Sequence, residues 1–310
     1  MKHTNKYLIS IVGPTAIGKT ALSIKLANYF NTEIVSADSR QFFKEMSIGT
    51  AAPTTQELAA AKHHFIHNRS ITEDYNVGTF EKEAISCIQN LHQTNDIVIM
   101  VGGSGLYVDA VIKGLDYFPE VDKTIRIQLN TQLETEGLEI LQLKLKTLDP
   151  IAYNTIAVDN PQRVIRALEI CIGSGQPYSS FLNKYKNKRP FTSITIGLDA
   201  DREIIYNRIN QRVDIMIDNG LLDEVKALLP YKNLNSLNTV GYKEIFNYLD
   251  NTWTLDFAIS EIKKNSRRFA KRQLTWFRKK QDTLWFDYLT PIETITSKIE
   301  TIINKKNPAE

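Results

Sequence analysis

The sequence predicts an α/β protein in which a parallel, P-loop-type sheet has helices on both faces and is interrupted by an all-helical insertion. Three observations lead to this prediction. A glycine-rich loop at residues 13–20 joins an apolar run to a helical pattern. Short apolar runs then alternate with helical patterns, which is typical of parallel sheets. Strand-like patterns disappear after about residue 118 and return only at residue 191.

The first loop has the spacing of a phosphate-binding loop. It follows the apolar run 7–12, precedes the helical pattern 21–30, and consists of Gly13, Pro14, Thr15, Ala16, Ile17, Gly18, Lys19 and Thr20. The glycines let main-chain N–H groups converge on anionic oxygens, Lys19 adds a positive charge, and the Thr20 hydroxyl can ligate Mg²⁺. The N-terminus of the following helix attracts the same anion. We therefore expect the chain to bind a di- or triphosphate.

The elements after the loop complete the first half of the sheet. A short buried strand is expected at 33–38, helices at 54–62 and 79–92, and a strongly apolar strand at 96–101, followed by a glycine turn at 102–105 and a helix at 106–113. In such a sheet, ligands bind at the carboxyl ends of the strands.

The middle of the chain shows only helical patterns. Helices are expected at 124–136, 138–148 and 161–172, the last ending at Gly173. Residues 119–190 are therefore predicted to form an insertion domain within a discontinuous core of residues 1–118 and 191–310. In the second core segment we expect a strand at 191–198, a helix from Asp201 to Gly220, further helices to about 280, a strand at 284–286 and a final helix at 291–305.

The composition is that of an ordinary globular protein. Of 310 residues, 42% are hydrophobic and 24% are charged, and a net charge of +3 gives no general affinity for polyanions. Cys87 and Cys171 lie far apart in apolar contexts, so we expect free thiols in a reducing compartment. Without a signal-peptide core or a membrane span in the sequence, we expect a cytoplasmic protein with no membrane partner.

Asp38 is the first candidate for chemistry. It ends the second predicted strand and is followed by Ser39, Arg40 and Gln41. It could hold Mg²⁺ through water, as a Walker-B aspartate does, or act as a general base beside the phosphates. A turn or helix-capping role is the structural alternative. The sequence has no separate apolar strand ending in Asp-Glu and no guanine-binding motif. This leaves open that the diphosphate is a leaving group on carbon.

Three further patterns have both functional and structural interpretations. The 102–105 turn could let the backbone approach a ligand, or it could be an ordinary strand-to-helix turn. Arg208 and Arg212 share a helix face, which suits either a diphosphate clamp or a solvated face paired with Glu203 or Asp214. His63, His64 and His67 have no cysteine or carboxylate nearby in sequence, so we favour surface or supporting roles over a metal site.

Basic residues recur at helical spacing between 263 and 280. They are Lys264, Arg267, Arg268, Lys271 and Arg272, and we expect Phe269, Trp276 and Phe277 to face away from them. Such a stripe on a nearly neutral protein is typical of nucleic-acid binding, although an amphipathic helix with a solvated basic face would look the same. Gln162, Arg163 and Arg166 form a smaller basic cluster in the insertion.

Taken together, these segments resemble the tRNA dimethylallyltransferase family, in its bacterial form. The matching segments occur in order along nearly the whole chain and are 13–20, Ser-Ala-Asp-Ser-Arg-Gln (36–41), Ile-Gly-Thr-Ala (48–51), His-His-Phe (63–65), Val-Gly-Gly-Ser-Gly-Leu-Tyr (101–107), Asn-Pro-Gln-Arg-Val-Ile-Arg-Ala-Leu-Glu (160–169), Val-Gly-Tyr-Lys-Glu (240–244) and Arg-Arg-Phe-Ala-Lys-Arg-Gln-Leu-Thr-Trp-Phe-Arg (267–278).

The resemblance implies a reaction and a set of site residues. Dimethylallyl diphosphate would bind to residues 13–20 and Arg212, with Mg²⁺ shared between Thr20 and the diphosphate. Asp38 would be the base for the adenine amine, and Thr15 would lie near the bridging oxygen. Contacts with the tRNA anticodon stem-loop would come from Asp38, Ser39, Arg40, Gln41, Ser104, Arg126, Gln162, Arg163, Val164, Ile165 and Arg166. We expect the protein to act as a monomer.

Two positions depart from the family pattern. Ala52 stands where the family usually has lysine, and His67 stands where aspartate is common. The zinc-finger tail of eukaryotic relatives is missing from the sequence. Two other functions stay open at this point: prenylation of free adenine nucleotides, and a P-loop kinase or NTPase. A non-catalytic RNA-binding module fits less well with Lys19, Thr20 and Asp38 together.

Overall fold

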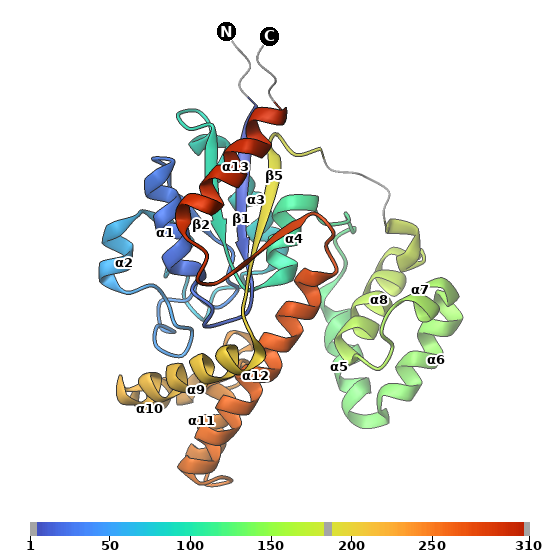
Figure 1. Ribbon diagram of the computed structural model, residues 1–310. Helices are drawn as coiled ribbons and strands as arrows, with labels where there is room; N and C mark the ends of the chain where they lie inside the picture. Colours follow the sequence, from blue (N-terminus) through green and yellow to red (C-terminus); the bar gives the residue numbers. More distant parts are fainter. Residues whose placement is uncertain (1–4, 183–187, 307–310) are drawn as a thin grey trace. The chain divides into compact units, whose positions relative to one another are not determined.

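The structure is a computed structural model that describes residues 5–182 and 188–306. In this part of the chain, six strands form one parallel sheet in the order β3-β2-β4-β1-β5-β6 (Figure 1). The strands are β1 (Tyr7–Val12), β2 (Ile34–Ser36), β3 (His63–His64), β4 (Ile97–Val101), β5 (Thr192–Asp199) and β6 (Thr283–Asp287). The central strand β1 lies between β4 and β5, so the loop that follows it leaves the middle of the sheet.

Helices cover both faces of the sheet, as the sequence predicts. The helices of the core unit are α1 (Lys19–Tyr29), α2 (Thr55–Ala60), α3 (Val77–Leu91), α4 (Gly105–Lys113), α9 (Arg202–Asp218), α10 (Leu221–Ala227), α11 (Tyr242–Leu249), α12 (Leu255–Arg278) and α13 (Ile292–Lys306). Ile9 of β1 belongs to the hydrophobic cluster of α1 and α13, and its neighbour Leu8 belongs to that of α3 and α4. Because successive strand residues point to opposite faces, one apolar run serves two cores.

A third hydrophobic cluster joins helices α9 to α12 to the segment that follows β2. Val213 of α9, Tyr242 of α11 and Ile262 of α12 pack with Phe43 and Met46. Burial of these side chains holds α9 and α12 against residues 38–51.

The described chain divides into two compact units, Met1–Ile112 with Arg189–Glu310, and Lys113–Lys188. The limits expected from the sequence, 118/119 and 190/191, lie a few residues away. In its described part the second unit is helical, with α5 (Lys123–Glu136), α6 (Leu138–Leu148), α7 (Pro150–Thr155), α8 (Pro161–Ser174) and a 3₁₀ turn (Tyr178–Phe181). It has its own core of leucines and small residues, including Leu129, Leu141, Leu145 and Leu168.

Three local expectations were wrong or incomplete. Helix α8 continues through Gly173 and is capped by Gly175 at φ 68°. Gly173 serves packing instead, because a Cβ there would lie 2.5 Å from Val121. The short strand β3 and helix α7 were not predicted, since neither is long enough to show a periodic pattern.

Other expectations can be compared directly with the structure. Cys87 and Cys171 are free thiols. In the described segments, no helix has the length and apolar character needed to cross a membrane.

Candidate active site

A pocket of about 430 Å³ opens at the carboxyl ends of β1 and β2. Its polar wall comes from the phosphate-loop segment, the segment after β2 and the turn after β4, through Thr15, Lys19, Asp38, Ser39, Arg40 and Ser104. Arg212 of α9 closes the same wall. The structure therefore brings together three segments that the sequence singled out separately.

The backbone of the phosphate loop is bent into an anion-binding shape. Gly13 has φ 144°, and a Cβ there would lie 2.6 Å from the carbonyl oxygen of Leu198 on β5. Ala16 at φ 66° and Gly18 at φ 110° are both left-handed. Such backbone turns orient N–H groups towards a shared concavity. The Nζ of Lys19 donates to the carbonyl oxygen of Pro14 at 2.8 Å, which holds the ammonium group over the loop.

Two arginines of α9 face this loop. The Nε of Arg208 donates to the carbonyl oxygen of Ala16 at 2.7 Å, and Nη1 of Arg212 lies 3.5 Å from the hydroxyl oxygen of Thr15. Asp214, the alternative partner considered from the sequence, forms an ion pair with Lys263. The arginine face of α9 is thus directed at the loop that binds phosphate.

Asp38 lies beside the glycine turn, through its sequence neighbour Ser39. Ser104 accepts a hydrogen bond from the N–H of Ser39 and donates one to the Ser39 hydroxyl, both at 3.0 Å. The N–H of Arg40 donates to Oδ1 of Asp38 at 3.2 Å. Gln41 donates to the carbonyl oxygens of Thr50 and Ala51, so it supports a neighbouring wall of the pocket.

Burial shifts the pKa values of Asp38 and Lys19. Removal from water raises the pKa of Asp38 above its ordinary value of 3.8, although the Arg40 N–H and Lys19 act in the opposite direction. Burial and the neighbouring Arg212 lower the pKa of Lys19 to about 8, against the opposing effect of Asp38. A bound anion would offset the repulsion between Lys19 and Arg212. The raised pKa makes Asp38 a stronger proton acceptor than an ordinary aspartate.

Part of the pocket lining is apolar. It is formed by Ile209, Val213 and Met216 of α9, Val240, and Ile262 of α12. A pocket with a cationic end and an aliphatic side suits an amphiphilic ligand that carries a negative headgroup.

Two supporting residues were missed by the sequence analysis. Gln273 of α12 is 5% exposed and hydrogen-bonds to the loop and to the glycine turn. Glu224 of α10 accepts hydrogen bonds from the main-chain N–H groups of Ser47, Ile48 and Gly49, at 2.8–3.0 Å. Gln273 lies within the matching segment 267–278, but neither residue is part of a local pattern that indicates its partner.

The helical unit holds a second group of candidate residues. Arg126 and Arg166 share the buried carboxylate of Glu169, while Gln162 and Arg163 are exposed. Val164 and Ile165 are fully buried in the core of this unit. Neither side chain reaches the surface, so both pack in the core, and the expected contact of this segment with RNA stays a prediction.

The basic side of α12 differs from the expectation in one respect. Arg268, Lys271 and Arg272 are exposed, but Phe269 is exposed with them and lines the pocket together with Arg272. The Arg272 guanidinium carbon lies 5.8 Å from the centre of the Phe269 ring. Trp276 is also exposed, at 38%. Phe277 is 0% exposed and faces away from the basic residues as predicted, because α12 packs on the sheet at that end.

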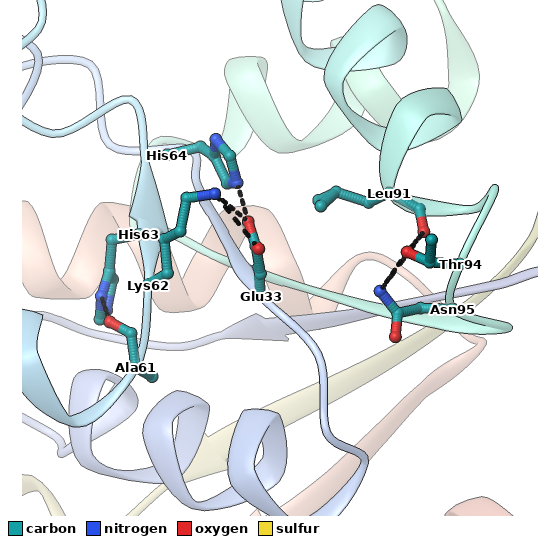
Figure 2. Close-up of polar contacts among 8 residues, drawn as sticks. All are labelled: Glu33, Ala61, Lys62, His63, His64, Leu91, Thr94 and Asn95. Carbon is teal, nitrogen blue, oxygen red and sulfur yellow. Dashed lines mark hydrogen bonds and ion pairs between the residues drawn. The ribbon is translucent and has the colours of Figure 1, made fainter.

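The histidines have structural partners. Figure 2 shows His64 against Glu33, with Nε2 2.5 Å from Oε2, and His63 against the carbonyl oxygen of Ala61 at 2.8 Å. The contact of His64 fastens the edge strand β3 to Glu33, directly before β2, whereas that of His63 is local. Within residues 5–182 and 188–306, no three His, Cys, Asp or Glu residues cluster as a metal site.

An Mg²⁺ ion would fit this site if the protein and a bound diphosphate held it together. Thr20, a partly exposed residue at the first turn of α1, carries a hydroxyl oxygen directly after Lys19. Mg²⁺ prefers such oxygen ligands and is often bound through one or two protein groups plus substrate phosphates. The donor set therefore suits an ion held jointly by Thr20 and a bound diphosphate.

Comparison with known proteins agrees with this geometry. Residues 41–280 match the family model described as IPP transferase. A tRNA dimethylallyltransferase of Flavobacterium johnsoniae is 62% identical, covering 92% of this chain and 94% of the relative, and that of Christiangramia forsetii is 59% identical, covering 97% and 99%.

Solved structures are similar over the same length. The tRNA isopentenylpyrophosphate transferase of Bacillus halodurans has a TM-score of 0.74 at 38% identity, covering 97% of this chain and 98% of that one. A eukaryotic dimethylallyltransferase, described as acting on tRNA, has a TM-score of 0.80 at 27% identity, covering 97% and 79%. The chain therefore belongs to the tRNA dimethylallyltransferase, or IPP transferase, family.

Proposed function

We propose that this protein transfers a dimethylallyl group from dimethylallyl diphosphate to the exocyclic amine of the adenosine next to the anticodon, on its 3′ side, in tRNA. The observation that supports it most is the single pocket that holds the phosphate loop, Asp38 and an aliphatic wall. The phosphate loop would bind the diphosphate, Asp38 would face the incoming nitrogen, and the aliphatic wall would contact the isoprenoid. The names of the relatives point to the same activity.

The transfer exchanges one bond for another. The lone pair of the adenine amine forms a bond to the allylic carbon, whose bond to the bridging oxygen breaks, so that diphosphate leaves with the electron pair. The proton of the amine passes to the carboxylate of Asp38, whose raised pKa favours its acceptance. Main-chain N–H groups, Lys19 and Arg212 stabilise the charge that develops on the leaving group.

Thr15 and Thr20 have separate roles in this proposal. The Thr15 hydroxyl, next to Arg212, would lie close to the bridging oxygen of the donor. Thr20 would hold Mg²⁺ together with the diphosphate. The ion, when bound, supplies further neutralisation of the leaving group.

The tRNA would be held by both units. The target base must leave its stack to reach Asp38, because the pocket lies within the core unit. Ser39, Arg40, Gln41 and Ser104 surround that position, and Arg126, Gln162, Arg163 and Arg166 would contact phosphates of the anticodon stem-loop. The insertion would grip the RNA, with Val164 and Ile165 supporting α8 from inside.

The proposal is tested by incubating the protein with Mg²⁺ and labelled dimethylallyl diphosphate, in the presence of either unmodified tRNA or AMP. Label in tRNA is the expected result, and position-specific digestion should place it at the adenosine beside the anticodon. Label in AMP alone would instead indicate prenylation of free nucleotides. Turnover of ATP without any prenyl transfer would indicate a P-loop kinase or NTPase.

Two further expectations belong to this proposal. We place the enzyme in the cytoplasm, where unmodified tRNA is available, and we expect one chain to suffice because one chain contains the complete pocket. Light scattering at the concentration used for turnover would test whether one chain suffices. A dimer at that concentration would contradict this expectation.

A further inference from the structure

Gln273 connects two separate segments of the pocket. Its Oε1 accepts a hydrogen bond from the N–H of Thr15 at 2.8 Å, and its Nε2 donates to the carbonyl oxygen of Gly103 at 2.9 Å. The two partners fix the orientation of the amide, because an N–H needs an acceptor and a carbonyl oxygen needs a donor. At 5% exposure, water does not compete for these bonds.

The glycine turn is shaped around this amide. A Cβ at Gly103 would lie 2.4 Å from Nε2 of Gln273 and 3.7 Å from Oδ2 of Asp38. A side chain at position 103 would therefore displace the amide, whereas glycine lets it approach the main chain. Position 103 therefore neighbours both the Gln273 amide and the carboxylate of Asp38.

The main chain and one further hydrogen bond connect the amide to the segment of Asp38. Gly103 is followed by Ser104, whose hydroxyl group accepts from the N–H of Ser39, next to Asp38. The phosphate loop on one side and the acidic segment on the other are thus linked through one side chain of α12. Thr15 and Gln273 are 258 residues apart in the sequence.

We propose that Gln273 is a positioning residue that fixes the distance between the donor loop and Asp38. This inference rests on the proposed function, since it assumes that diphosphate binds to the loop and that the acceptor nitrogen binds beside Asp38. Transfer requires reacting atoms about 3–3.5 Å apart, so independent movement of the two segments lowers turnover. Binding of each substrate alone does not need the bridge.

A purely structural role for Gln273 predicts a different response to substitution. Q273M keeps the size of the side chain but leaves both main-chain partners without hydrogen bonds. Q273E keeps both bonds only while the new carboxyl is protonated, because a carboxylate repels the Gly103 carbonyl oxygen. If Gln273 served only for packing, the activity of Q273E would not depend on whether its new carboxyl is charged.

The experiment measures transfer of labelled dimethylallyl to tRNA with each substrate varied up to saturation, from about pH 5.5 to about pH 8.5, where a buried carboxyl can change charge. We expect Q273M to lower kcat about 10- to 100-fold, with KM for donor and for tRNA within about twofold of wild type. We expect Q273E to match Q273M at high pH and to recover relative to wild type as the pH falls.

Q142E serves as the matched control. Gln142 also donates to a main-chain carbonyl oxygen, that of Val158 at 2.8 Å, but it does not line the pocket. Its activity relative to wild type should not change with pH. A wild-type kcat in Q273M, or a constant ratio of Q273E to wild type across the pH range, would overturn the inference. Should Q273M fail to fold, the pH response of Q273E decides alone. Absence of transfer by the wild type would refute the proposed function instead.

Discussion

Arg126 donates two hydrogen bonds to the carboxylate of Glu169, from Nε at 3.2 Å and from Nη2 at 3.0 Å. Arg166 donates to the same carboxylate at 2.9 Å. The Glu169 side chain is 8% exposed, while those of Arg126 and Arg166 are 44% and 42% exposed. One buried acid therefore holds two guanidinium groups at the surface of the helical unit, in the fixed geometry that suits phosphates.

E169Q is expected to weaken tRNA binding through these two arginines. The amide can hold at most one of them well, so KM for tRNA should rise about five- to tenfold, the equivalent of roughly 1 kcal/mol. Steady-state kinetics with varied tRNA would measure this, and kcat should stay unchanged. E139Q, an exposed acid of the same unit, is the control. An unchanged KM would show that the arginines do not need Glu169.

D38N is expected to abolish turnover while sparing RNA affinity. The amide keeps the shape of the side chain but cannot accept the proton, and removal of a general base typically costs about 10²- to 10⁴-fold. Single-turnover transfer and filter binding of tRNA would measure the two effects separately. Equal turnover in D38N and wild type would exclude Asp38 as the base.

The pH dependence of kcat/KM should report the environment of Asp38. The base acts only when it is ionised, so activity is lost as the pH falls through its pKa in the folded protein. Because burial raises that pKa, the midpoint of the acid limb should lie above the ordinary value of 3.8. Rate measurements across the acid range, with circular dichroism to monitor folding, would check this. A midpoint at or below the ordinary value contradicts the expectation.

R212M should raise KM for the donor more than KM for tRNA. The guanidinium near Thr15 provides a charge-assisted contact to the diphosphate, and loss of about 1.5–3 kcal/mol corresponds to a rise of about 10- to 100-fold. R202M is the matched control, because Arg202 is exposed at the start of the same helix. Similar donor KM values in both variants would place the diphosphate elsewhere.

Y242F should destabilise the part of the pocket wall that Gly49, Thr50 and Ala51 form. The Tyr242 hydroxyl donates to Oε1 of Glu224 at 2.7 Å, and Glu224 holds the N–H groups of residues 47–49. Loss of a hydrogen bond to a charged acceptor should lower the free energy of unfolding by about 1.5–3 kcal/mol. Urea unfolding would measure it, with Y117F, at an exposed tyrosine, as the control. A midpoint equal to that of the control would refute this role.

Local patterns in the sequence were sufficient for most of the fold. The phosphate loop has a recognisable spacing of glycines, and apolar runs with clear boundaries mark β1, β4 and β5. The absence of strand patterns indicated the insertion. Strand β3 has only two residues, and its pairing with Ile34 and Val35 depends on the sheet that surrounds it. No periodicity exists at that length.

The site was predicted less completely because its supporting contacts are long-range. Residues 13–20, Asp38 and Arg212 were found through motifs and helical spacing. The structure brings Thr15, Lys19, Asp38 and Arg212 into one pocket. Glu224 resembles any surface acid of an amphipathic helix, yet it serves a loop more than 170 residues earlier in the chain. Val164 and Ile165 were included because the family resemblance covers the whole segment 162–166, and only the packing of α8 shows that their side chains face inward.

The central place of β1 between β4 and β5 has a consequence for synthesis on the ribosome. Strand β4 follows within the first third of the chain, but β5 emerges only after the entire helical unit. Until then one edge of β1 stays open to pairing with other nascent chains. A translational pause within residues 113–191 would prolong that exposure, so slow codons there should increase aggregation of the newly made protein.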